Sequence, residues 1–185
     1  GFGRYTLWNL TSGTANNAFG ATALQSNTSG GYNNAFGVSS LSSNTTGANN
    51  TAVGHQVGYS NTTGSHNTSL GYQALYSNTT ANNNTAVGYQ SLYNAAAAGN
   101  NVALGYQAAY ILLSGGNVAI GSSSMALNSA TSGTNLYNVA VGYQALEAYS
   151  ATTANISNNV AIGYQAMRSY SNTTASVTQN VAIGQ

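Results

Sequence analysis

The chain has no cysteine and no proline, and its 185 residues include three charged side chains, Arg4, Arg168 and Glu147. The absence of cysteine excludes disulfide bonds and thiolate metal sites. Two arginines without any lysine cannot neutralise a row of phosphates or form a basic face, so we expect no nucleic acid partner and no binding to an anionic membrane surface. No apolar run approaches the roughly 18 residues of a membrane-spanning helix, so no membrane insertion by this segment is expected.

The same scarcity of ionisable groups argues against catalysis. General acid–base chemistry needs two titratable groups within reach of each other, and Glu147 is the sole carboxylate among the side chains. His55 and His66 occupy different positions in the repeat described below and have no carboxylate or cysteine near them in sequence. We therefore predict no catalytic, metal or cofactor site, and do not expect an enzyme.

What the chain does have is a regular glycine, always preceded by a large apolar residue. Successive glycines are 17 residues apart six times, then 16, then 21 three times. Such a repeat is typical of one short unit stacked on itself. The glycines are Gly3, Gly20, Gly37, Gly54, Gly71, Gly88, Gly105, Gly121, Gly142, Gly163 and Gly184.

The residues around each glycine alternate in a way that predicts short strands. A small residue, usually Ala, lies two positions before it, with Asn, Thr or Val three positions before it. A second segment follows the glycine, as in Gly71-Tyr72-Gln73-Ala74-Leu75, and we expect a second strand there. Seventeen residues are too few for a crossover helix, so the remaining solution is an all-β parallel β-solenoid or β-roll of ten to eleven coils, with two short strands per coil.

We interpret residues 1–185 as a single repeat domain. Residues 1–121 form uniform coils of 16–17 residues, and residues 122–185 form 21-residue coils with longer loops. Because the sequence starts with Gly1 rather than Met, we expect it to be part of a longer chain. The enlarged loops, 126–136, 147–158 and 168–179, are the expected binding region, since insertions on one face of a solenoid commonly mark its binding face.

In a stack, residues at the same position of successive coils become neighbours. An asparagine four residues before each glycine is therefore expected to form a ladder of amides. By the same reasoning Glu147 and Arg168, each five residues past its glycine, should form an ion pair between coils. The ladder residues are Asn16, Asn33, Asn50, Asn67, Asn84, Asn101, Asn117, Asn138, Asn159 and Asn180.

Three further columns of residues suggest sites on the surface. Tyr59, Tyr76, Tyr93 and Tyr110 share one position, where they either pack or offer a platform for sugars or proteins. Asparagines in Asn-X-Ser/Thr sequences recur seven residues past a glycine, in a loop expected to be exposed, and are candidate glycosylation sites. The loop threonines beside them suggest ice binding as a minor alternative. The candidate glycosylation sites are Asn27, Asn44, Asn61 and Asn78.

The repeated motif Asn-Val-Ala-Ile-Gly at 117–121, 159–163 and 180–184 resembles the head repeat of trimeric autotransporter adhesins, the YadA-like head. The resemblance covers essentially the whole chain and implies a left-handed β-roll with three chains side by side. The segment 71–80, Gly-Tyr-Gln-Ala-Leu-Tyr-Ser-Asn-Thr-Thr, looks more like repeats of phage tail fibres and of surface proteins of environmental bacteria.

These observations predict a structural and adhesive role outside the cell, at the cell surface or in a virion fibre. The first hypothesis is a homotrimeric adhesin head that attaches to a surface or a host, with a host-surface protein or glycan as partner. The alternatives are a phage or virus tail-fibre shaft and a subunit of a self-assembling extracellular filament, which would grow by an open end-to-end contact.

Overall fold

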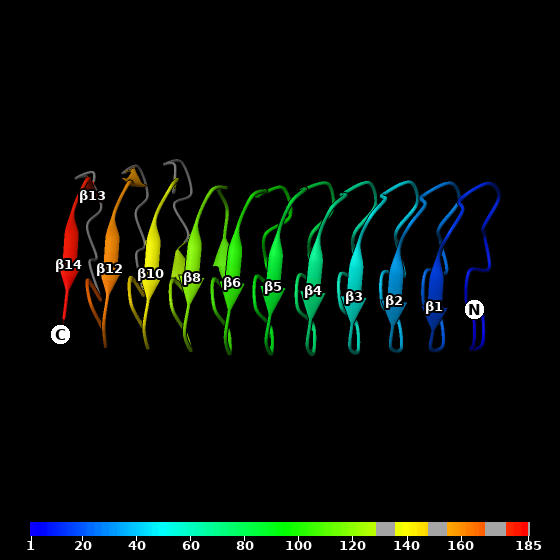
Figure 1. The fold of residues 1–185 in the computed structure, drawn as a ribbon, viewed down its shortest axis with the longest axis horizontal. Coiled ribbons are helices and arrows are strands. Elements are labelled where there is room, and N and C mark those ends of the chain that lie inside the picture. Colours follow the sequence, from blue (N-terminus) through cyan, green and yellow to red (C-terminus); the bar gives the residue numbers. More distant parts are fainter. Residues whose placement is uncertain (129–135, 148–154, 169–176, 185) are drawn as a thin grey trace.

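The protein is a rod built from one parallel sheet that runs along its whole length (Figure 1). The computed structural model describes residues 1–128, 136–147, 155–168 and 177–184. Ten three-residue strands form this sheet, and each pairs in parallel with the strand of the next coil. The predicted all-β parallel solenoid is thus confirmed.

The strands of the long sheet follow the chain in order. They are β1 (Asn17–Phe19), β2 (Asn34–Phe36), β3 (Thr51–Val53), β4 (Thr68–Leu70), β5 (Thr85–Val87), β6 (Val102–Leu104), β8 (Val118–Ile120), β10 (Val139–Val141), β12 (Val160–Ile162) and β14 (Val181–Ile183). Equivalent residues pair directly, for example Ala35 with Ala52, so the register never slips by a residue. At about 4.8 Å per strand, the sheet is roughly 45 Å long.

Four shorter strands form two small parallel sheets in the second half of the chain. β7 (Ile111–Leu112) pairs with β9 (Leu127–Asn128), and β11 (Ile156–Ser157) pairs with β13 (Val177–Thr178). Leu112 is fully buried seven residues past its glycine, where earlier coils bury an asparagine such as Asn78. Ile156 is also fully buried, and its carbonyl accepts from Asn138 Nδ2 as the Gly64 carbonyl accepts from Asn50. A leucine therefore replaces an amide in the interior where β7 appears.

The segment after each glycine was predicted to be a second strand, and this part of the prediction is wrong. Residues 72–76 form consecutive turns, in which Gln73 and Leu75 have φ of 52° and 56°. The backbone still bonds to both neighbouring coils, because the Gln73 N–H donates to the His55 carbonyl (3.0 Å) and the Leu75 N–H donates to the Ser91 carbonyl (3.0 Å). Hydrogen bonding between coils is kept, but the extended backbone of a strand is not.

This curled segment places ordinary residues in the left-handed region in coil after coil. Thr22 and Leu24 have φ of 59° and 50°, although a left-handed conformation costs a residue other than glycine about 1–2 kcal/mol. Leu24 is fully buried and Ala23 packs beside it, so burial and hydrogen bonds between coils hold the strained backbone in place. Gly58 takes the same slot as Leu24 in its own coil, with a φ of 57°.

The repeated glycine is required by both its conformation and its surroundings. Gly88 has φ of 131°, and a Cβ at this position would overlap the carbonyl of Gly105 in the next coil. The same overlap recurs down the stack, for instance at Gly71 against Gly88. Successive coils therefore approach closely at the bend, and only a residue without a side chain fits there.

Replacing Gly88 by Ala should lower the free energy of unfolding by about 3 kcal/mol, because it adds a backbone clash to a φ that L-residues rarely adopt. The matched control is Gly31→Ala, whose added Cβ would lie 3.1 Å from the Thr14 carbonyl oxygen at an ordinary φ. Urea unfolding followed by circular dichroism measures both. Equal midpoints for the two variants would contradict the assigned role of the bend.

Candidate interaction face

The outer face of the long sheet carries a continuous row of large apolar side chains, because each strand turns its small central residue inward. Ala35 and Ala52 are fully buried, whereas Phe36 on the same strand as Ala35 is exposed. Larger side chains such as Leu24 fill the same interior from elsewhere in the coil, and the strand contributes a small residue to it. The residues on either side of that alanine consequently face outward.

Two columns of residues make up this face. We call the residue before each glycine the aliphatic file and the residue three before it the graded file. The aliphatic file runs Phe2, Phe19, Phe36, Val53, Leu70, Val87, Leu104, Ile120, Val141, Ile162 and Ile183. The graded file runs Asn17, Asn34, Thr51, Thr68, Thr85, Val102, Val118, Val139, Val160 and Val181.

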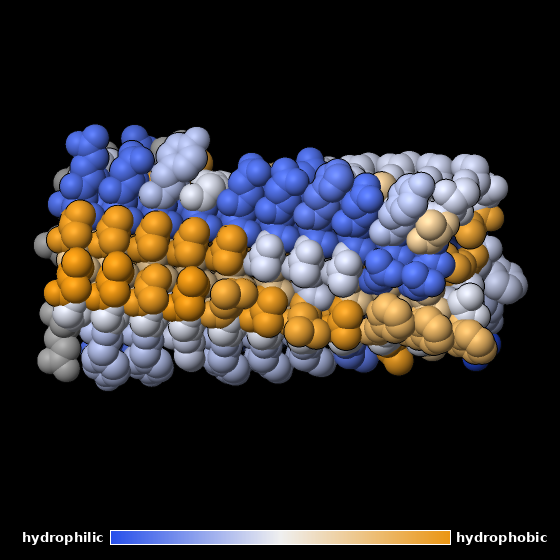
Figure 2. Space-filling model, viewed as in Figure 1, coloured by the Kyte–Doolittle hydropathy of each residue, from blue (hydrophilic) through white to orange (hydrophobic). Residues whose placement is uncertain are grey.

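Figure 2 shows the consequence as a hydrophobic band along the rod. The band has two rows over the C-terminal coils and narrows to one row over the N-terminal coils, where the neighbouring row turns polar. The sequence explains the change, because the graded file passes from Asn through Thr to Val between β1 and β14. From β1 to β14 neither file contains a charged residue.

At the N-terminal end the two files stack in regular ladders of their own. The rings of Phe2, Phe19 and Phe36 lie parallel, with centroids 5.2 and 5.1 Å apart. Beside them the Asn17 amide donates to the Asn34 side-chain oxygen at 2.8 Å. The amides are thus held in fixed orientation at the surface of the sheet.

An exposed tyrosine file borders this face just past the glycines. It consists of Tyr72, Tyr89 and Tyr106, with centroids 5.2 Å apart, and His55 stacks on Tyr72 at 5.5 Å. The next residue in each of these coils is glutamine. Gln73, Gln90 and Gln107 each donate Nε2 to the Oε1 of the glutamine one coil earlier, over 2.8–3.0 Å, and the series ends at Gln56. Aromatic residues beside an apolar centre are typical of protein interfaces.

The predicted platform of Tyr59, Tyr76, Tyr93 and Tyr110 is a second stacked file, half-buried in all four coils. Its centroids are 5.1–5.2 Å apart, with planes within 12° of parallel. Ring faces therefore cover one another along the rod and are not free to stack on sugars. This geometry favours packing over a sugar platform.

The second tyrosine file also changes how one phenol ionises. Burial raises the pKa of Tyr93 above its ordinary value of 10.0, and the neighbouring phenols of Tyr110, Tyr76 and Tyr72 add to the rise. An ionised phenol at Tyr93 would lose hydration and lie beside other phenols that also become negative.

The asparagines four residues before the glycines form a continuous buried ladder. Each Oδ1 accepts from the next coil, as where Asn50 donates its backbone N–H (3.0 Å) and its Nδ2 (3.1 Å) to Asn33. Every ladder Nδ2 except that of Asn84 also donates to a loop carbonyl, as where Asn50 donates to the Gly64 carbonyl at 2.8 Å. The pattern of backbone donation continues from Asn16 to Asn180.

The asparagines expected to be exposed and glycosylated are instead buried, and the prediction of exposure is wrong. Asn27, Asn44, Asn61 and Asn78 have at most 1% of their surface exposed. Asn61 Nδ2 donates to Asn44 Oδ1 (2.7 Å) and to the Gly64 carbonyl (2.9 Å). A glycan on this nitrogen would need space inside the coil, so the folded chain cannot carry sugars there.

This second ladder ends where the repeat changes. Ala95 occupies the position one coil after Asn78, and Asn78 Oδ1 is buried without a hydrogen-bond partner. Asn84 Nδ2 is also buried and unpartnered. The replacement of asparagine by Ala95 therefore leaves the buried Asn78 Oδ1 without a donor from the next coil.

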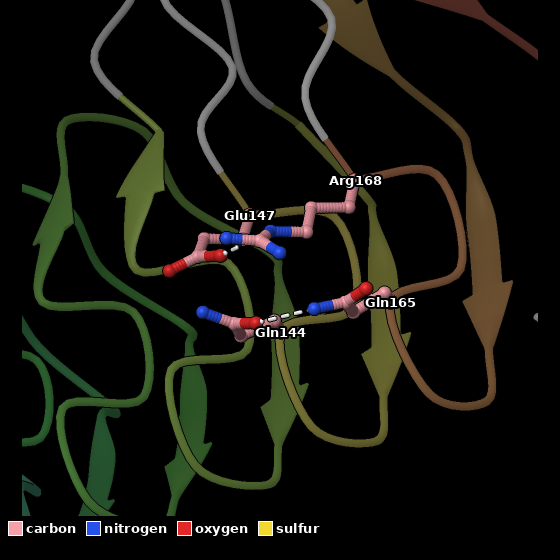
Figure 3. Close-up of polar contacts among 4 residues, drawn as sticks. All are labelled: Gln144, Glu147, Gln165 and Arg168. Atoms are coloured by element: carbon pink, nitrogen blue, oxygen red, sulfur yellow. Dashed lines mark hydrogen bonds and ion pairs between the residues drawn. The ribbon is translucent and has the colours of Figure 1, made fainter.

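Glu147 and Arg168 lie one above the other in successive coils (Figure 3). Arg168 Nε donates to Glu147 Oε2 at 2.9 Å, and Gln165 donates to Gln144 at 2.8 Å beside them. Because the Arg168 side chain is well exposed to solvent, the pair contributes at most about 1 kcal/mol.

The remaining predictions concern the loop threonines, the enlarged loops and metal binding. Thr45, Thr62 and Thr79 each donate their hydroxyl to a backbone carbonyl one coil away, so these protons already serve bonds between coils. Most of the expected binding loops, 126–136, 147–158 and 168–179, lies outside the described residues. Within the described part of the chain, no three His, Cys, Asp or Glu side chains come together as a metal site would need.

Comparisons with family models, curated proteins and solved structures found no match. The resemblance to the YadA-like head therefore stays a prediction. A search of the described ranges for a long apolar helix able to cross a membrane found none.

Asn61→Ala should lower the free energy of unfolding by about 2–3 kcal/mol, because it leaves Asn44 Oδ1 and Asn78 Nδ2 with fewer partners inside the coil. Asn94→Ala is the control, since Asn94 is exposed. Urea midpoints of the two variants test the ladder. A loss at Asn61 no greater than that at Asn94 would show that the buried amides do not stabilise the stack.

The raised pKa of Tyr93 predicts a loss of stability in alkali. Above about pH 10 the unfolded chain releases the Tyr93 proton while the folded chain retains it, so the free energy of unfolding falls as pH rises through the folded-state pKa. In Tyr93→Phe this fall should be shallower above pH 10, with no difference in slope at neutral pH. Tyr32→Phe, on a ring outside both tyrosine files, controls for the loss of a hydroxyl.

Proposed function

We propose that this protein is a rigid, non-enzymatic segment of an extracellular fibre, an adhesin head in which three copies associate through the face formed by the aliphatic and graded files. The observation that supports it most is the uncharged apolar band along a parallel stack (Figure 2). An exposed strip of this kind is typical of a surface covered by a protein partner.

The stack itself suits a mechanical role. Amide ladders and backbone hydrogen bonds tie every coil to the next, so a pull along the rod is shared by many equivalent bonds. The partner in the adhesive contact is a host-surface protein or a glycan. A tail-fibre shaft has the same requirements for length and rigidity and is the second candidate.

Light scattering on the purified chain tests the association. We expect a discrete mass three times the 18.7 kDa of one chain. Growth without a fixed end point would support the alternative of a self-assembling filament. A monomer at all concentrations would contradict both.

Ile120→Asp should shift the mass from trimer to monomer while the circular dichroism spectrum stays that of the wild type. Ile120 is exposed on the aliphatic file, between Leu104 and Val141, so its replacement places a charge at the centre of the proposed contact. Burying such a charge without a partner costs several kcal/mol. Thr63→Asp, in an exposed loop, is the control and should remain trimeric.

A further inference from the structure

The exposed tyrosine file is interrupted in one coil. The position just past the repeated glycine is Tyr89 and Tyr106 in two successive coils and Tyr143 and Tyr164 in two later ones, but it is Ser122 in the coil between them. Tyr106 stacks on Tyr89 and Tyr143 stacks on Tyr164, with ring centroids 5.2 and 5.4 Å apart. One ring of the stack is thus replaced by a small hydroxyl side chain.

Among the described residues, the rings on either side of Ser122 each stack on one face only. Strands β6, β8 and β10 pair in direct register, so Tyr106, Ser122 and Tyr143 lie one above another, each two residues past its strand. Tyr106 is 52% exposed, whereas Tyr89, which has a ring on both sides, is 43% exposed. The uncovered faces of Tyr106 and Tyr143 are two strand spacings apart, about 10 Å, so one further ring can stack between them.

The glutamine row beside the tyrosines is interrupted in the same coil, where Ser123 takes the position of Gln107 and Gln144. Gln107 donates its Nε2 to Gln90 in the coil before. Gln144 accepts at its Oε1 from Gln165 in the coil after, and Figure 3 shows the Gln144 amide nitrogen on the other side. Within the described part of the chain, Gln107 Oε1 accepts no hydrogen bond from another residue and Gln144 Nε2 donates none.

A ligand that fits both interruptions needs a ring and an amide side by side. The ring stacks between Tyr106 and Tyr143, in the place that a tyrosine has in the regular coils. The amide donates its N–H to Gln107 Oε1 and accepts from Gln144 Nε2, as the glutamine amides of the regular coils do with their neighbours. Aromatic walls with a few placed polar groups are typical of sites for small ligands.

We propose that Tyr106, Tyr143, Gln107 and Gln144 bind one N-acetylhexosamine unit of a glycan. A pyranose ring carries C–H bonds on both faces and packs between two aromatic rings, and its acetamido group supplies one N–H donor and one carbonyl acceptor beside the ring. None of the four side chains is charged, which suits a neutral sugar. The inference rests on the adhesive function proposed above and names the class of glycan and the residues that hold it. The site lies in neither the aliphatic file nor the graded file.

Equilibrium dialysis of the chain against labelled methyl glycosides tests the proposal, because it measures both the affinity and the number of sites. We expect one site per chain for the methyl glycoside of N-acetylglucosamine or of N-acetylgalactosamine. Methyl glucoside and methyl galactoside keep the ring but lack the acetamide, so their affinity should be at least about tenfold lower. Equal affinity with and without the acetamide, or no binding of either acetamido sugar, would overturn the proposal.

Ser122→Tyr combined with Ser123→Gln fills the interruption with the chain's own side chains and should abolish binding. Both rows then continue as they do in the neighbouring coils, so the urea midpoint should not fall. Sugar binding retained by this folded variant would show that the site lies elsewhere. Tyr32→Phe, outside both tyrosine files, is the control and should bind as the wild type does.

The reciprocal variant creates a second interruption of the same form. Tyr89→Ser combined with Gln90→Ser leaves a gap between Tyr72 and Tyr106, with an unused acceptor on Gln73 and an unused donor on Gln107. The number of sugar sites should rise from one to two per chain. A folded variant that still has one site would contradict the proposed recognition.

Benzamide carries its amide on an aromatic ring and separates a sugar site from a site for flat aromatic compounds. Binding of benzamide without binding of either acetamido sugar would overturn the assignment to a sugar. Light scattering on the same samples keeps this test apart from that of the proposed function. A trimer that binds no sugar overturns the site alone, and a monomer that binds the sugar overturns the association alone.

Discussion

Each coil lies one strand spacing from the next, and every other feature of the protein adapts to that distance. At the bend the backbones are so close that a single carbon atom on Gly88 would overlap Gly105. On the strand, the thin interior admits alanine and sends the larger side chains outward. The wide apolar face therefore follows from the alternation of the strand, since the residues on either side of the buried alanine point away from the interior.

The short spacing also explains why amides fill so much of the interior. A side chain that both donates and accepts can bond to its own copy above and below, which a hydroxyl or a carboxylate does less well. Asn33 and Asn50 are an example, because Asn33 Oδ1 accepts both the backbone N–H and the side-chain Nδ2 of Asn50 in the next coil. The buried asparagines thus serve as structural groups whose polarity is fully used inside the stack, apart from the two atoms at the change of repeat.

Sequence periodicity was sufficient to predict the parallel stack, because equal spacing implies equivalent neighbours whatever the path of the chain. It could not say which way each column faces. Asn61 lies in a polar loop sequence that suggests exposure, yet the loop folds over it and supplies the Gly64 carbonyl as an acceptor. Polar and apolar residues alternate around Gln73 and Leu75, which predicts a strand. In the structure these two residues instead have left-handed backbone conformations in consecutive turns. The apolar face was missed for the same reason, although the invariant small residue between two larger ones was the available signal.

The scarcity of charge follows from stacking in register. A charged residue repeated at one position would place like charges one coil apart, and two unit charges at about 5 Å repel by more than 3 kcal/mol at an effective dielectric constant of 20. A neutral side chain can therefore recur at one position of every coil. A charged side chain needs an opposite charge at that position of the adjacent coil, as Glu147 and Arg168 show. The exposed face of the long sheet follows the same rule, because neither the aliphatic file nor the graded file contains a charged residue between β1 and β14.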